Sequence, residues 1–94
     1  MKTGDVRNVD VVMQIGKAFQ WYRIEKQWSE GELATEIIKK GLKKIPYDQI
    51  LKIEKGEKIP TLPMIMTLCD ALDITINELF DQAQIFARRR QALT

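Results

Sequence analysis

The amino-acid sequence predicts an all-α fold of five helices in a single domain. Apolar residues recur at intervals of three and four positions along most of the chain, as they do on the buried face of a helix. Segments 29–32 (SEGE) and 75–78 (TINE) have the capping-box pattern that marks the start of a helix. A chain of 94 residues, of which 45% are hydrophobic, is sufficient to enclose one core.

The first predicted helix covers about residues 11–27 and has Asp10 as its N-cap. Its inner face is defined by apolar residues at positions i, i+4 and i+7 with one neighbour, namely Ile15, Phe19, Tyr22 and Ala18. Trp21 and Ile24 lie off this stripe, and they add more apolar surface than one small core needs. We expect them either on a surface that meets a partner or as single exposed apolar side chains, which are common.

The second and third predicted helices are separated by Gly41. The second starts at the Ser29 capping box and ends before that glycine, because glycine often follows the last helical residue. Its inner face consists of Leu33, Ala34 and Ile37, with Ile38 as a further candidate. The third spans Pro46–Lys55, since proline fits the first turn of a helix. Its polar side carries Tyr47, Asp48, Gln49 and Lys52, opposite the inward-pointing Ile50 and Ile53.

The fourth and fifth predicted helices also start at recognisable caps. Thr61 is the N-cap of the fourth, which extends to Leu72 and tolerates Pro63 in its first turn. Its buried face is expected to hold Leu62, Ile65, Leu68, Cys69 and Leu72. The fifth begins at the Thr75 capping box and continues through Phe80.

The chain is expected to comprise an N-terminal arm (residues 1–10), a helical domain (residues 11–81) and a C-terminal tail (residues 82–94). The tail has a helix-forming composition but few apolar residues. The sequence leaves three alternatives open for the tail: it lengthens the fifth helix, it adds a dimer contact, or it frays.

The composition excludes most kinds of catalytic site. The chain has no histidine, which removes the commonest general base and the commonest metal ligand. Its one cysteine, Cys69, offers no zinc-binding spacing and is expected to be a packed core thiol. The five glycines are scattered, so no glycine-rich phosphate loop is present. We therefore expect a binding function without enzymatic activity, metal or cofactor.

The sequence is also typical of a soluble cytoplasmic protein. No stretch approaches the roughly 18 apolar residues that a membrane span requires. The N-terminal segment lacks the apolar region of a signal peptide, and a single cysteine suits a reducing compartment.

Positive charge is concentrated in the middle of the chain. The net charge is only +2, but residues 39–58 contain seven basic and three acidic residues, while each flank has a net charge of −1. Such a segment is typical of a surface that binds a polyanion, and equally of a solvated lysine face.

Four fragments, taken in order, resemble a known family. They are residues 28–34 (WSEGELA), 53–56 (IEKG), 58–62 (KIPTL) and 68–80 (LCDALDITINELF). Over residues 13–81 the chain resembles the five-helix DNA-binding domains of the phage lambda repressor and Cro family, the xenobiotic-response-element type. The resemblance implies a helix-turn-helix in which the third predicted helix enters the major groove and the second crosses the backbone.

The resemblance also implies roles for individual residues. Tyr47, Asp48 and Lys52 occupy the positions that usually meet base edges, and Gln49 is their neighbour. Phosphate contacts are implied for Lys55 and Lys58, and Ser29, Lys43 and Lys44 are also expected among the DNA-binding residues. Arg23 and Glu54 are expected to form a half-buried pair that joins the first and third predicted helices. The alternative for the third helix is an ordinary solvated polar face.

Two departures from the family pattern concern the helix-turn-helix itself. Glu30 replaces the glutamine that usually anchors a phosphate and would repel one instead. Residues 38–44 stand where the family usually has a single residue, and they bring Lys39, Lys40, Lys43 and Lys44 with them. The longer turn either tilts the recognition helix or binds the DNA backbone. Three roles are open for these lysines: contact with phosphate, stabilisation of a helix C-terminus, or solubility alone.

The function that this pattern predicts is a sequence-specific regulator of transcription. We expect a homodimer that binds double-stranded DNA and represses by occupying a promoter. One alternative is the antitoxin of a toxin–antitoxin pair, in which Trp21, Ile24 and the tail bind the toxin. Another is a protein-interaction module that has lost DNA binding, for which Glu30 and Asp48 would be the signs.

Overall fold

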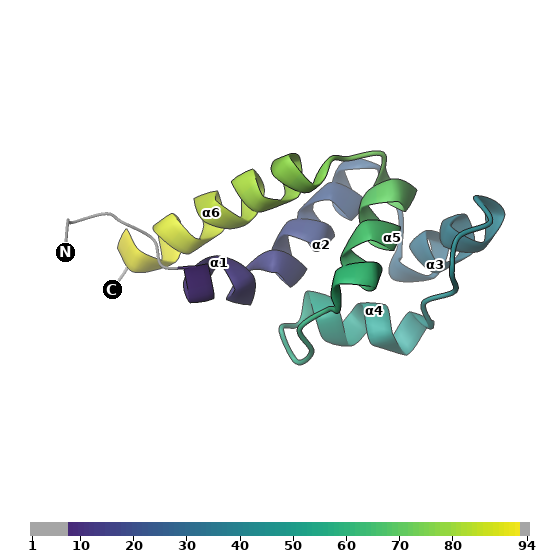
Figure 1. The fold of residues 1–94 in the computed structure, drawn as a ribbon, viewed down its shortest axis with the longest axis horizontal. Coiled ribbons are helices and arrows are strands. Elements are labelled where there is room, and N and C mark those ends of the chain that lie inside the picture. The colour runs from purple at the N-terminus through teal and green to yellow at the C-terminus, as the bar shows by residue number, and fades with distance from the viewer. Residues whose placement is uncertain (1–7, 93–94) are drawn as a thin grey trace.

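The computed structural model describes residues 8–92, and within them the fold contains six α-helices and no strand (Figure 1). The helices are α1 (Asn8–Met13), α2 (Ile15–Glu25), α3 (Glu30–Lys39), α4 (Tyr47–Glu54), α5 (Leu62–Leu72) and α6 (Ile76–Ala92). The all-α class is therefore confirmed, but the helix count differs from the predicted five.

The first predicted helix is two helices, because the backbone leaves the helical path at Gln14 (φ −102°, ψ 2°). Helix α1 includes Asp10, so the prediction of Asp10 as an N-cap is wrong. Most of the predicted N-terminal arm, residues 1–7, lies outside the described residues. The periodicity did not reveal the break, since Val11 and Ile15 keep the i, i+4 spacing and are both buried.

Helix α6 extends well beyond residue 80 and covers one side of the molecule (Figure 1). The segment that the sequence assigned to a tail is helical through Ala92. It contributes Ala83, Phe86 and Ala87 to the buried residues, against α1 and α2. The chain therefore uses this segment to enlarge the core.

The helix-turn-helix consists of α3 and α4, which pack against α2 and α5. Helix α3 ends at Lys39, and Gly41 follows its C-cap with a φ of +71°, which favours glycine. The N–H of Leu42 then donates to the carbonyl oxygen of Ile37 (3.1 Å). The lengthened turn that follows α3 has no regular secondary structure and is attached to the core by half-buried Leu42 and buried Ile45.

The core is formed mainly by five helices, α2 to α6. Its largest fully buried side chains are Phe19, Leu33, Ile37, Ile50, Ile53, Leu68, Leu72 and Leu79. The predicted burial of Leu62 is wrong: this residue is 63% exposed, because it begins α5 at the edge of the molecule. Ala34 and Tyr22 are only partly buried, and the Tyr22 hydroxyl donates to the carbonyl oxygen of Glu78 (3.1 Å).

Candidate nucleic-acid interface

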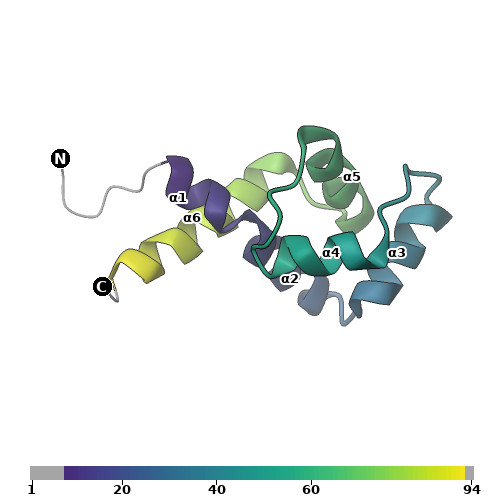
Figure 2. The same ribbon diagram turned by 90° about the horizontal axis from the view of Figure 1, so that it is seen from below.

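Helix α4 lies at the front of the molecule when it is seen from below (Figure 2), and most of its polar side chains are exposed. Tyr47, Asp48 and Lys52 are exposed, and Gln49 is half-buried beside them. Seen from below, α4 crosses the front of the molecule, and the connectors at its two ends lie on either side. The residues that were predicted to meet base edges are therefore displayed on one accessible surface, at the position expected of a recognition helix.

The inner face of α4 is held by a buried ion pair. Arg23 of α2 donates from Nε to Oε2 of Glu54 (2.7 Å) and from Nη2 to Oε1 (2.9 Å). The two side chains are only 8% and 3% exposed, and the hydrogen bond to Glu54 raises the pKa of Arg23 above its ordinary value. The predicted pair is present, and it attaches the end of α4 to α2.

Arg23 also organises the start of α3. Its Nη1 donates to the carbonyl oxygen of Trp28 (2.6 Å), and its Nη2 lies 3.5 Å from Oε2 of Glu30. Glu30, the residue that departs from the family pattern, therefore interacts with the buried arginine. The Ser29 hydroxyl accepts from the N–H of Glu32 (3.1 Å), which completes the predicted capping box. A phosphate contact by Ser29 stays a prediction.

Helices α2 and α4 also approach each other closely at Gly16. A Cβ atom added at this position would lie 1.8 Å from the carbonyl oxygen of Ile53. Only glycine permits this backbone contact, which sets the position of the end of α4. Sequence reasoning missed the role of Gly16, since a glycine inside an amphipathic pattern does not show what it packs against.

The lysines of the lengthened turn adjoin a lysine that follows α4. Lys43 and Lys44 line a hollow of about 350 Å³ together with Gln49 and Lys58. We call this the lysine hollow. The structure thus gathers four of the predicted DNA-contacting residues around one depression, at the side of α4 and next to the start of α5.

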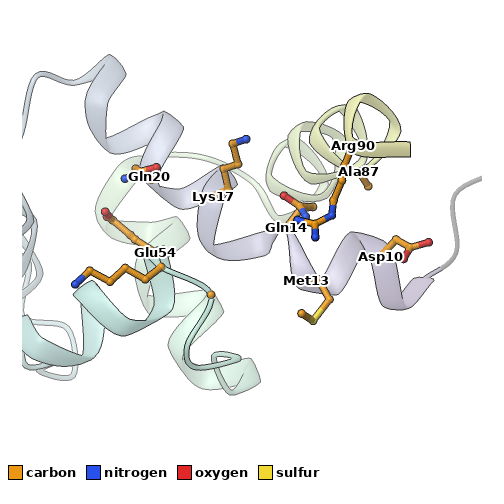
Figure 3. Close-up of a pocket in the computed structure, with 10 residues that line it drawn as sticks. Asp10, Met13, Gln14, Lys17, Gln20, Glu54, Ala87 and Arg90 are labelled. Atoms are coloured by element: carbon orange, nitrogen blue, oxygen red, sulfur yellow. The ribbon is translucent and has the colours of Figure 1, made fainter. Parts of the chain in front are cut away.

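Lys55 lies at a second hollow, of about 570 Å³, between the end of α4 and the helices α1, α2 and α6 (Figure 3). Two basic residues that sequence reasoning missed, Lys17 and Arg90, share its lining. The ammonium group of Lys17 lies 4.8 Å from the centre of the Phe86 ring. The sequence had no signal for this grouping, because it did not place α6 beside α2.

Lys40 has a structural role, unlike its neighbours in the turn. Its Nζ donates to the carbonyl oxygens of Asp70 (3.1 Å) and Ala71 (3.2 Å) and to Oδ1 of Asp73 (3.0 Å). It therefore caps the C-terminus of α5 and lowers the pKa of Asp73. Lys39, Lys43 and Lys44 are exposed.

Two further features of the described residues concern other kinds of site. Residues 8–92 contain no helix that is long and apolar enough to cross a membrane. The same residues contain no cluster of three or more carboxylate, thiol or imidazole groups placed to hold a metal ion.

The family relationship follows from comparison with known proteins. The family model for the Cro/C1-type HTH DNA-binding domain matches residues 22–82, which is more than half of the chain. Comparison with curated proteins and with solved structures gave no match. The matched region includes α3, α4 and α5 entirely, and α4 is the second helix of the helix-turn-helix. The chain therefore belongs to the Cro/C1-type helix-turn-helix DNA-binding domains.

Proposed function

We propose that this protein is a sequence-specific transcriptional repressor that acts as a homodimer by occupying promoter DNA. The observation that carries the proposal is the outward polar face of α4, with Tyr47, Asp48 and Lys52 exposed. The buried Arg23–Glu54 pair supports it, because a recognition surface must be held in a defined orientation.

The chemistry of this face suits the edges of base pairs in the major groove. The Lys52 ammonium can donate to the O6 and N7 acceptors of guanine, and the Asp48 carboxylate can accept from the N4 amino group of cytosine. Lysines that follow α4 would contact phosphates, which position a protein on DNA without reading its sequence. These lysines are Lys55 and Lys58.

A homodimer follows from the small reach of one recognition helix. A single helix of this type reads only a few base pairs, whereas a two-fold pair reads two half-sites about 34 Å apart. Occupying a promoter requires no activity beyond binding. We therefore assign the chain to the regulators and give it no catalytic role.

A protein partner, as in an antitoxin, is the second candidate. Trp21 and Ile24 on α2 are 39% and 56% exposed, and they are large apolar side chains outside the recognition face. In this alternative the chain binds DNA through α4 and a second protein through α2. Co-expression with proteins encoded beside its gene, followed by co-purification, distinguishes it from a regulator that acts alone.

The experiment that tests the proposal is binding-site selection from random duplexes, with the wild type and Lys52→Ala. We expect the wild type to select a two-fold symmetric site. The variant should lose about 1–3 kcal/mol for that site and accept more sequences. Lys39→Ala is the matched control, because Lys39 is also exposed but lies at the end of α3. An unchanged preference in Lys52→Ala would contradict the assignment of α4 as the reading surface.

A further inference from the structure

We propose that the lengthened turn between α3 and α4 forms an additional binding site for the DNA backbone at the lysine hollow. The inference rests on the proposed function and deepens it, since it names a phosphodiester ligand for one part of the surface. It also selects between the two predicted effects of the longer turn, in favour of backbone binding.

The lining of the lysine hollow is one-sided in charge. Lys43, Lys44 and Lys58 border it with the polar groups of Gln49, Thr61 and Thr67, and no carboxylate takes part. The second hollow, in contrast, includes Asp10 and Glu54. Hydrogen-bond donors and positive charge in a lining without carboxylates are the features that favour an anion.

The three lysines also lack a counter-charge in the part of the chain that the structure describes. The ion pairs there involve Arg23, Lys26 and Lys40, and none involves a lysine of this hollow. Like charges held near one another repel, so an incoming anion relieves this repulsion in addition to forming its own contacts. The charge of the lysine hollow therefore favours the binding of a polyanion.

The turn holds its lysines in place because apolar residues anchor both of its ends. Leu42 packs against the core before Lys43, and Ile45 is only 4% exposed after Lys44. On the other side of the hollow, the N–H of Lys58 donates to the carbonyl oxygen of Lys52 (3.2 Å). Anchored backbone on both sides reduces the conformational entropy lost on binding.

The position of the hollow indicates that the ligand is a DNA strand and not a free anion. Gln49 belongs to the first turn of α4, so the hollow adjoins the reading face directly. A helix that lies in the major groove has a phosphate backbone along each side. The turn lysines and Lys58 therefore meet the strand that borders α4 on the α5 side.

The test compares Lys43→Gln/Lys44→Gln with the wild type on the selected duplex. Each phosphate contact contributes a slope of about −0.9 to log K against log salt, so the variant should flatten the slope by about 1.8. Phosphate ethylation should interfere with wild-type binding at positions beside α4 that no longer matter to the variant. The preferred sequence should not change. Arg88→Gln/Arg89→Gln is the control, because it removes two exposed charges from α6 at the other end of the molecule and should leave both measurements unchanged.

Lys58→Gln provides the second arm, because it lies 14 positions after Lys44 but lines the same hollow. It should abolish interference at the same phosphates as the turn variant. An unchanged slope and ethylation pattern in the turn variant would overturn this inference while leaving the proposed function intact, as would a shifted sequence preference. Failure of the wild type to bind any duplex would overturn the proposed function itself. Thermal unfolding checks that every variant is folded.

Discussion

Arg23 is the residue on which the geometry of the reading surface depends most. Its guanidinium contacts Glu54 of α4, the carbonyl oxygen of Trp28 and the carboxylate of Glu30. One side chain therefore joins α2, the start of α3 and the end of α4. A buried charge with several partners is stable only while those partners remain, since each ion was removed from water when the chain folded.

We expect Arg23→Met to lower the free energy of unfolding by about 3–5 kcal/mol, because the carboxylate of Glu54 would stay buried without a partner. Urea denaturation monitored by circular dichroism measures this loss. The double variant Arg23→Met/Glu54→Leu should recover part of it, since no unpaired carboxylate remains. Equal stability of Arg23→Met and the wild type would show that the pair contributes nothing to the fold.

Burial controls the chemistry of Cys69, whose pKa it raises from 9.0 to about 11. We expect iodoacetamide to modify the native protein very slowly at pH 8, because the thiolate is the reactive form. The same protein in guanidinium chloride, which exposes the thiol, is the control. Because the folded pKa is raised, the stability that the neutral thiol contributes is complete below pH 9.0 and is lost as the pH rises toward 11. Rapid modification of the native protein at pH 8 would contradict this burial.

At the scale of the elements, two contacts determine where the helices lie. The close approach of α2 and α4 requires a glycine at position 16, and the packing of α6 on α1 and α2 accompanies the burial of Phe86. Both contacts join segments that are far apart in the sequence, so neither is visible in a local pattern.

Gly16→Ala should lower the free energy of unfolding by about 3 kcal/mol or more, because the new Cβ has no space beside Ile53 and neither backbone can move freely. The loss can be measured by thermal and urea denaturation. Gly31→Ala is the matched control: its Cβ would lie 3.8 Å from the Ser29 hydroxyl oxygen, an ordinary contact. That change should stabilise α3 by about 0.5–1 kcal/mol. Similar effects of the two substitutions would contradict the close contact.

Phe86→Ala should lower the free energy of unfolding by about 3–5 kcal/mol, because Phe86 is only 8% exposed and its removal leaves a cavity between α6 and its neighbours. Ile85→Ala, at a neighbouring site that is 41% exposed, should change it by less than about 0.5 kcal/mol. If both variants kept the stability of the wild type, the second half of α6 would lie outside the folded core.

The whole molecule is elongated, with extents of 45 × 22 × 20 Å. Helix α1 and the far end of α6 occupy one end, and the helix-turn-helix occupies the other (Figure 1). Helix α4, which carries the proposed reading face, lies along one side, so a second copy beside it would present a second α4 to the same face of DNA.

We therefore expect two chains to bind one palindromic duplex whose half-sites are about 34 Å apart. Sedimentation velocity of the complex with the selected duplex measures the stoichiometry. Changing the spacing by half a helical turn should weaken binding strongly, because it rotates one half-site to the opposite face. A complex of one chain that tolerates every spacing would contradict the homodimer.

The sequence by itself determined the helix starts that depend on close neighbours. The capping boxes at Ser29 and Thr75 are present in the structure as predicted, because their hydrogen bonds join residues only three positions apart. Gly41 follows the helix that it was expected to end, and Gly56 follows α4 in the same way, since a positive φ is a local property of glycine. The four fragments were likewise sufficient to identify the family.

Tertiary structure alone decided the features that depend on distant partners. The break at Gln14, the exposure of Leu62 and the use of Lys40 as a cap for α5 could not be read from local spacing. The lysine hollow belongs to the same class, because its lining comes from the turn before α4, the connector after α4 and the start of α5. Hydrogen bonds within a helix turn are set by neighbours in sequence, whereas the burial and grouping of side chains are set by which helices meet.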